Sequence, residues 1–318
     1  MKAAVLQEAV AVESGQDPRN GEDLFVSQDK AGIHSIEKRN ETRDDLVRYV
    51  LRRVNMKDGH SYDVQSFSPH LVATNIPVTM TVPWMTEMSG FNTHMARNLA
   101  KLGFEVDLVS AERDIVLNPD IRASAANQLL IAEATARLHD RDTEKRIAIG
   151  VSRGAMIGFS LAAQAEEYGS EVIYGDYIAP CYPENLRAKQ LLQHARLPIS
   201  ELSTLRHVLE LPLATLKHYP ASLSVRPKSI INHLASAPHL MSGVAGQEAA
   251  KMPRDSVGHV TAFRGDIMSQ GENWQEIFAD SPNMAVELIA GGAHLSCASP
   301  TAMQSWKARF KTLAKELS

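Results

Sequence analysis

From residue 61 onward, stretches typical of β-strands alternate with stretches typical of helices, and no other feature limits the possible folds as strongly. This order requires crossover connections, which place parallel strands side by side and cover both faces of the sheet with helices. The sequence therefore predicts an α/β fold with a mostly parallel sheet. The expected strands are 63–67, 71–74, 78–82, 105–110, 146–151, 171–174, 259–263 and 285–289, and the expected helices are 93–102, 123–138, 154–168, around 274–278, and 301–316.

The alternation stops between residues 180 and 255. This stretch contains many Leu, His and Pro residues and no convincing strand, so it predicts several short helices. An insertion of roughly 75 residues is far longer than an ordinary connection between elements. We expect a helical cap or lid over a core made of residues 61–179 and 256–318.

Residues 1–60 differ in character from the rest of the chain. They are rich in charged and amide side chains, with few large apolar residues before Leu46. The segment predicts an N-terminal arm that ends in one helix docked on the core. The apolar residues at helical spacing in that helix are Leu46, Val47, Val50, Leu51 and Val54.

Composition excludes several classes of protein. With 44% hydrophobic and 22% charged residues, the chain can fill a core and is not intrinsically disordered. A net charge of −4, without any block of Lys or Arg, argues against a nucleic-acid partner. No window approaches about 20 consecutive apolar residues, so no membrane span is predicted. Gln7 and Glu8 interrupt the short apolar N-terminus, which argues against an export signal and leads us to expect a cytoplasmic protein.

The run Gly150-Val151-Ser152-Arg153-Gly154 carries the clearest chemical signal. It lies between the expected strand 146–151 and the helix that follows, which is a strand–turn–helix setting. A serine on such a turn has strained backbone angles, and the flanking glycines avoid clashes with the neighbouring strand and helix. The turn raises the hydroxyl above the carboxyl edge of the sheet, at the positive end of a helix. The pattern predicts that Ser152 is a nucleophile.

A serine nucleophile needs a base, and the base needs a carboxylate that orients it. His294 lies in a Gly-Gly loop after the strand 285–289, where a catalytic histidine can project toward the nucleophile. Asp266 follows the strand 259–263, and the chain order Ser152, Asp266, His294 is the one expected for this constellation. Asp176, at the expected end of the preceding strand, is the alternative acid.

Together, the serine turn, the Gly-Asp pair at Asp266 and the Gly-Gly-x-His sequence at His294 resemble the α/β-hydrolase superfamily. The resemblance covers about residues 61–180 and 256–318. It implies a three-layer α/β-hydrolase fold in which residues 180–255 are the cap.

The resemblance also implies an oxyanion hole made of backbone N–H groups. One belongs to Arg153, and we assign the other to Met85, in the turn after the strand 78–82. Family members usually carry His-Gly or a Gly-rich stretch at this turn, whereas this chain has Pro83-Trp84. Trp84 is a candidate for the wall of the substrate pocket.

The resemblance implies a serine hydrolase that transfers the acyl group of an ester or thioester to water and requires no cofactor. The histidines lack metal-binding spacing, and two cysteines cannot supply a four-Cys zinc site. The apolar residues of the insertion lead us to expect a small-molecule substrate with an apolar acyl group, of medium to long chain length rather than acetyl. Two alternatives remain: hydrolysis of a C–C or amide bond by the same triad, or a non-catalytic scaffold that binds a ligand or a protein.

Overall fold

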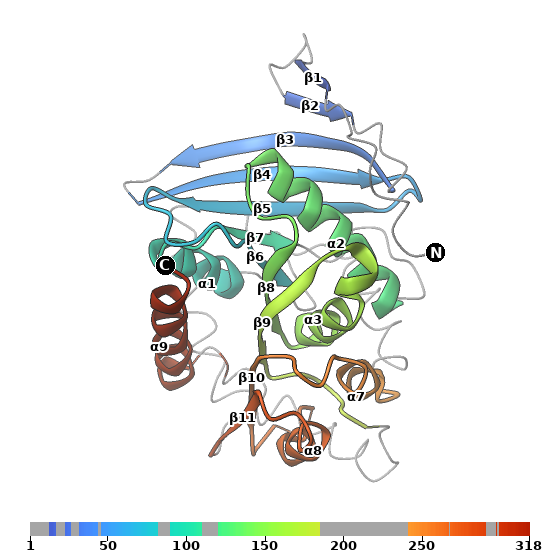
Figure 1. Ribbon diagram of the computed structural model, residues 1–318, viewed down its shortest axis with the longest axis vertical. Coiled ribbons are helices and arrows are strands. Elements are labelled where there is room, and N and C mark those ends of the chain that lie inside the picture. Colours follow the sequence, from blue (N-terminus) through green and yellow to red (C-terminus); the bar gives the residue numbers. More distant parts are fainter. Residues whose placement is uncertain are drawn as a thin grey trace.

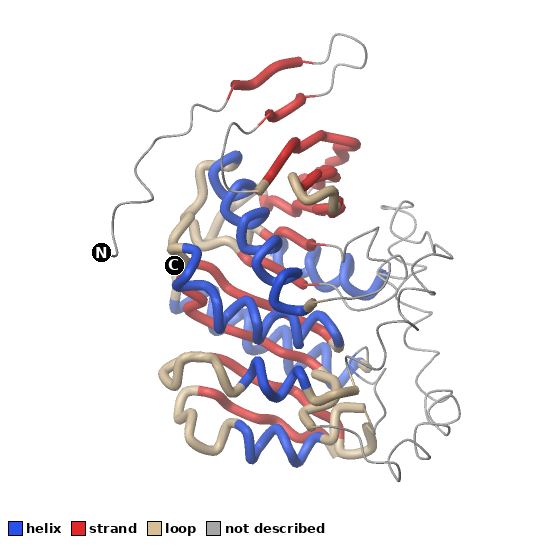
Figure 2. Tube along the Cα trace, turned by 90° about the vertical axis from the view of Figure 1, so that its right-hand side faces the viewer, coloured by secondary structure: helices blue, strands red, loops and turns tan. Residues whose placement is uncertain are grey.

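A single sheet runs through the computed structural model, with helices on both of its faces (Figures 1 and 2). The structure describes residues 13–16, 23–26, 32–43, 46–81, 90–109, 120–184, 241–266, 268–290, 297 and 299–318.

Within these residues the sheet has 11 strands in the order β1-β2-β3-β4-β5-β7-β6-β8-β9-β10-β11. The pairs from β1 to β5, and the pair β5–β7, are antiparallel, whereas the strands from β7 to β11 are parallel. The expected mostly parallel core is therefore confirmed. The strands are β1 (Glu13–Gln16), β2 (Asp23–Val26), β3 (Ile33–Arg43), β4 (Val47–Met56), β5 (Ser61–Pro69), β6 (Val78–Thr81), β7 (Val106–Val109), β8 (Lys145–Val151), β9 (Glu171–Ile178), β10 (Gly258–Phe263) and β11 (Met284–Ile289).

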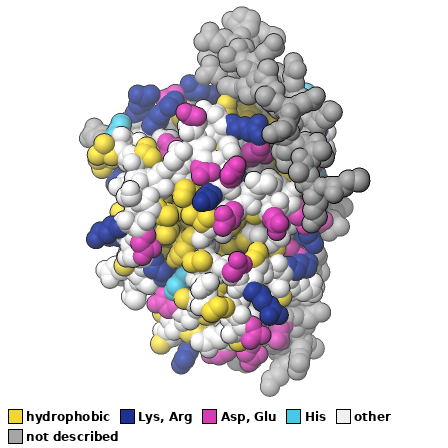
Figure 3. All heavy atoms as spheres, in the orientation of Figure 1, with side chains coloured by type: hydrophobic (Ala, Val, Ile, Leu, Met, Phe, Trp, Pro, Cys, Tyr) yellow, Lys and Arg dark blue, Asp and Glu magenta, His cyan; other side chains and the backbone are white. Residues whose placement is uncertain are grey.

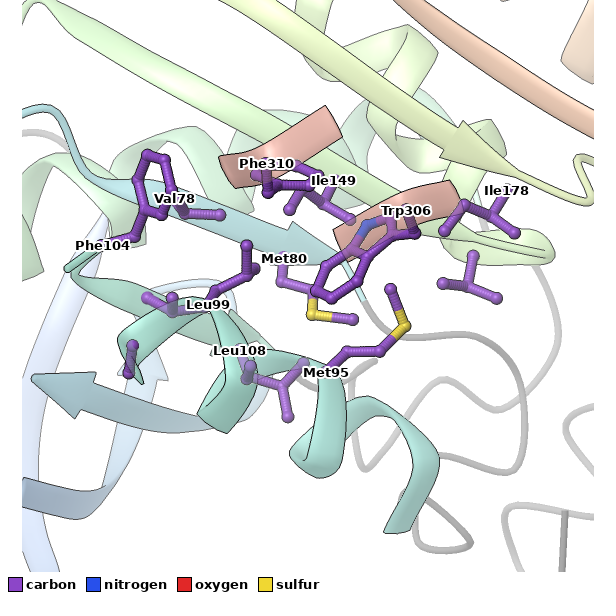
Figure 4. Close-up of a cluster of buried hydrophobic side chains, with 14 of the residues drawn as sticks. Val78, Met80, Met95, Leu99, Phe104, Leu108, Ile149, Ile178, Trp306 and Phe310 are labelled. Atoms are coloured by element: carbon purple, nitrogen blue, oxygen red, sulfur yellow. The ribbon is translucent and has the colours of Figure 1, made fainter. Parts of the chain in front are cut away.

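Helices cover the two faces of the sheet (Figure 1). The helices are α1 (Gly90–Lys101), α2 (Ile121–Leu138), α3 (Arg153–Gln164), α7 (Val244–Ala249), α8 (Gly271–Ile277) and α9 (Pro300–Glu316), and a 3₁₀ turn (Ala165–Tyr168) extends α3. On one face α1 and α9 pack over a core cluster shown in Figure 4. On the other face α3, α7 and α8 share a second cluster, and α2 also covers the antiparallel strands.

The central strands are buried on both faces, which explains their continuous apolar sequences. All four residues of β6 and all four of β7 are buried, as are the last six of β8. Parallel strands between two helical layers have this composition because neither face contacts water. Figure 4 shows the side chains that fill one of these layers, among them Met80, Met95, Ile149, Trp306 and Phe310.

The helix expected around residues 46–54 is wrong. Residues 47–56 form β4, which pairs with β3 on one side and β5 on the other. Val50, Val54 and Met56 are also spaced for a strand, and nine residues of β4 have cross-strand partners in β5. Tertiary pairing overrides the helical spacing because the hairpin with β5 buries one side of β4 against α2.

The short strand expected at 71–74 is also wrong. Leu71 is 87% exposed, and this stretch joins β5 to β6 as an irregular surface connection. Its Ala73 N–H donates to the carbonyl of Gly103, but no ladder follows. Most of the expected cap, residues 185–240, lies outside the described residues, and α7 is the helix described near its end.

Charged side chains of both signs lie across the face seen in Figure 3. This distribution matches the nearly balanced content of 33 basic and 37 acidic residues. No helix in the described parts of the chain has the length and apolarity that a membrane span needs.

Candidate active site

Ser152 lies on a strained turn between β8 and α3. Its backbone angles are φ 56° and ψ −123°, in a region that side-chain-bearing residues rarely occupy. The turn is held from both sides, because the Ser152 N–H donates to the carbonyl of Ile178 (2.8 Å) and the Ser152 carbonyl accepts from the N–H of Ala155 (3.0 Å). The strain that the glycine-flanked motif predicted is therefore present in the backbone.

Gly150 shows why the motif needs a glycine two residues before the serine. A Cβ atom at this position would lie 2.5 Å from Ala155 Cα and 2.6 Å from Ala155 N, and would also contact the carbonyl oxygen of Gly154. All three are backbone atoms of the first turn of α3, so no side-chain movement can relieve the clash. Only glycine lets the helix start directly above the strand.

Thr81 supports the same turn from the neighbouring strand. It is the last residue of β6 and is fully buried. Its hydroxyl lies 2.5 Å from the carbonyl oxygen of Gly154 and 3.1 Å from that of Ile149, and it donates to these acceptors. Sequence reasoning missed this residue, because a threonine in a strand is usual on β-propensity alone.

A cysteine contacts the hydroxyl of Ser152. The Sγ atom of Cys181, three residues beyond the end of β9, lies 3.3 Å from the Ser152 Oγ atom, and either atom can donate. Cys181 is 3% exposed. Sequence reasoning missed this contact. The available signal was that the residue follows a strand whose carboxyl end faces the same edge as the end of β8.

Asp266 lies on the turn that follows β10, as expected. It is buried, and its N–H donates to the carbonyl of Phe263 (3.0 Å). Its carboxylate accepts from the N–H of Met268 (2.9 Å), an Asx-type contact that fixes the turn. Burial raises the pKa of the nearby Tyr182, and the charges of Cys181 and Asp266 add to this effect.

Asp176 occupies a different environment. β9 continues to Ile178, so Asp176 lies within the strand and not at its end. Its two carboxylate oxygens accept from Arg309 of α9, at 3.0 Å from Nε and 3.2 Å from Nη2. Burial raises the pKa of Asp176 to about 6, although Arg309 acts in the opposite direction.

Several of the expected site residues cannot be placed. His294, Trp84 and Met85 lie outside the described residues. Arg153 is the first residue of α3 and is buried. Ser152 occupies the N-cap position of α3, so the positive end of the helix dipole lies at the serine turn.

No family model and no curated protein matches this chain. Among solved structures, an arylesterase matches with a TM-score of 0.59 and 14% identity, over 87% of this chain and 86% of that one. An esterase from Rhodococcus sp. ECU1013 matches with a TM-score of 0.57 and 15% identity, over 84% and 99%. The chain has the α/β-hydrolase fold.

A further match supports this assignment. An esterase from Exiguobacterium antarcticum has a TM-score of 0.56 and 13% identity, over 81% of this chain and 97% of that one. In the α/β-hydrolase fold of this chain, β8, β9 and β10 are consecutive neighbours in the sheet and run parallel. Ser152, Cys181 and Asp266 follow these three strands, so they share one carboxyl edge. Such an edge is where open α/β sheets bind ligands.

Proposed function

We propose that the protein is a serine hydrolase that cleaves a carboxylic ester or thioester. The observation that carries this proposal is the strained Ser152 turn at the amino end of α3. A non-glycine residue with φ of 56° is costly, and such strain is retained where it serves a site. The turn presents a partly exposed hydroxyl beside N–H groups that can stabilise negative charge.

In the proposed reaction, the Ser152 Oγ atom attacks the carbonyl carbon while His294 takes the hydroxyl proton. The bond to the leaving oxygen or sulfur breaks, and His294 gives the proton to that group. Water then attacks the acyl-enzyme with the same base, which releases the acid and restores Ser152. The N–H groups of Arg153 and Met85 hold the oxyanion.

We assign Asp266 as the acid that orients His294. Asp266 follows the strand next to β9, on the same edge as Ser152, and its turn is fixed by the Met268 N–H. Asp176 is the weaker candidate, because both of its oxygens accept from Arg309 and it lies within β9.

The test is covalent labelling with a fluorophosphonate, which reacts with activated serines. The wild-type protein should be labelled, and Ser152→Ala should fold normally, lose the label and lose at least ~10³-fold in ester turnover. Ser256→Ala is the matched control, since Ser256 lies in a turn before β10, away from the site. A wild-type protein that resists the label and cleaves no acyl ester would instead favour a non-catalytic scaffold.

A further inference from the structure

The chain crosses the edge of the sheet between the candidate nucleophile and the candidate acid. After β9, residues 179–183 form this crossing segment. The Ala179 N–H donates to the carbonyl of Thr261 in β10 (2.7 Å), and the Tyr182 N–H donates to the carbonyl of Met268 (2.7 Å), beside Asp266. The segment is therefore attached to the acid's strand and turn at two points.

The crossing segment has little freedom to move. Ala179 has φ 48° and Tyr182 has φ 49°, so two non-glycine residues are held in the left-handed region on either side of Cys181. All three side chains are buried. Behind the segment, Gly246 of α7 packs against the carbonyl oxygen of Pro183 so closely that a Cβ atom there would clash. The backbone of residue 181 is therefore held in place.

The 3.3 Å distance between Cys181 Sγ and Ser152 Oγ places the thiol next to any acyl group on Ser152. A new covalent bond to Oγ is about 1.5 Å long, so the acyl carbon lies at most about 4.8 Å from the sulfur. Apolar groups are in contact at about 4.0–4.5 Å. The groups bonded to this carbonyl carbon therefore fill the space between it and the Cys181 sulfur. The α-carbon of the acyl group, which is bonded to the carbonyl carbon, is the chain carbon that contacts the sulfur most directly.

We propose that Cys181 is a specificity-determining residue that limits branching at the α-carbon of the acyl group, the carbon bonded to the carbonyl carbon. This inference rests on the proposed function, because it requires an acyl group on Ser152. Selection against branching differs from selection by acyl-chain length, because chain length is read by atoms of the acyl chain that lie farther from the Ser152 hydroxyl. Because α7 and the acid's turn hold the crossing segment, the protein cannot open space for a branch by moving residue 181 aside.

The experiment compares butyryl and isobutyryl esters, which have the same number of acyl carbons and differ in branching. For Cys181→Ala, kcat/KM for isobutyryl relative to butyryl should rise at least tenfold, the scale of one methyl-sized group in a closed pocket. For Cys181→Val the same ratio should fall at least tenfold. Cys181→Ser, which keeps the size and a hydrogen-bonding group, should leave the ratio within about threefold of the wild-type value.

Cys297→Ala is the control, since Cys297 is the other cysteine of the chain and packs in the core cluster under α9. Its ratio should equal that of the wild type. Each variant is first titrated with the fluorophosphonate, so that every rate is expressed per reactive serine. If the alanine and valine variants titrate normally and their ratios stay within twofold of the wild type, the inference is wrong while the proposed function survives. If the valine variant does not fold, the alanine variant decides alone. A wild-type protein without a reactive serine refutes the proposed function itself.

Discussion

Replacing Arg309 by methionine should destabilise the protein by about 3–5 kcal/mol at pH 8, because it leaves a buried carboxylate without its partner. Asp176 is fully buried in β9, and Arg309 of α9 contacts both of its oxygens, at 3.0 and 3.2 Å. Methionine keeps much of the aliphatic length of arginine and removes the charge. The loss therefore measures the uncompensated charge more than lost packing.

The penalty should depend on pH. Burial raises the pKa of Asp176 from an ordinary value of 3.8 to about 6, and Arg309 is the group that opposes this rise. Because the folded protein binds this proton more tightly than the unfolded chain, stability falls as pH rises from about 4 to the folded pKa. For the wild type the group contributes a fall of about 3 kcal/mol between pH 4 and 6. Without Arg309 the pKa of Asp176 in the folded protein rises further, so the free energy of unfolding continues to fall above pH 6.

Urea unfolding of the wild type and Arg309→Met at pH 5 and pH 8 measures this effect. The gap in unfolding free energy should be larger at pH 8. The double variant with Asp176→Asn removes the buried charge and should recover most of the loss at pH 8. Arg309 also donates to Glu287 and Ser305, and the double variant separates those contacts from the Asp176 pair. The reasoning is refuted if the wild type and Arg309→Met differ equally in unfolding free energy at both pH values and the double variant is no more stable than Arg309→Met at pH 8.

Three further predictions concern the site. Gly150→Ala should abolish fluorophosphonate labelling and lower stability by about 2–3 kcal/mol, because its Cβ meets only backbone. Gly59→Ala is the control: at φ 89° it should also lose some stability, but its Cβ meets nothing within 4 Å, so it should keep the label. Asp266→Asn should lower kcat by ~10⁴-fold through loss of the correct imidazole tautomer, while Asp176→Asn should cost less than about tenfold, and the reverse result would exchange the two roles. Across acetyl, butyryl, hexanoyl and octanoyl esters, kcat/KM should rise roughly fourfold per added methylene, from about 0.8 kcal/mol each; a flat or falling series would mean that no apolar acyl pocket exists.

The parallel core could be predicted from sequence because its signals are local. Short apolar strands, the helices between them and the glycine-flanked serine each occupy one stretch of chain. β4 was misread because the spacing of Val50 and Val54 suits both a helix and a strand. The pairing that decides between them comes from β3 and β5, and so from elsewhere in the sequence.

Asp176 was expected, together with Gly175, at the end of a strand. In the structure Gly175 lies inside β9, where a Cβ atom would be 2.6 Å from the ring of Tyr177. The backbone of Gly258 in β10 also approaches Gly175 closely. A glycine in a strand can thus mark close approach of a neighbour as well as a turn. The contact of Cys181 with Ser152 was missed for a related reason, since it depends on β8 and β9 being neighbours in the sheet.

The order of strands along the chain has a consequence for synthesis. β9 and β10 are neighbours in the sheet, yet roughly 80 residues separate them in sequence. At ~5–20 residues per second, the ribosome needs about 4–16 s to synthesise these residues. During that time the edge of β9 that will pair with β10 has no partner strand. An open edge of this kind can pair with other nascent chains. Chaperone demand should therefore peak in this interval and end once residues 258–266 emerge, which deliver both the covering strand and the candidate acid.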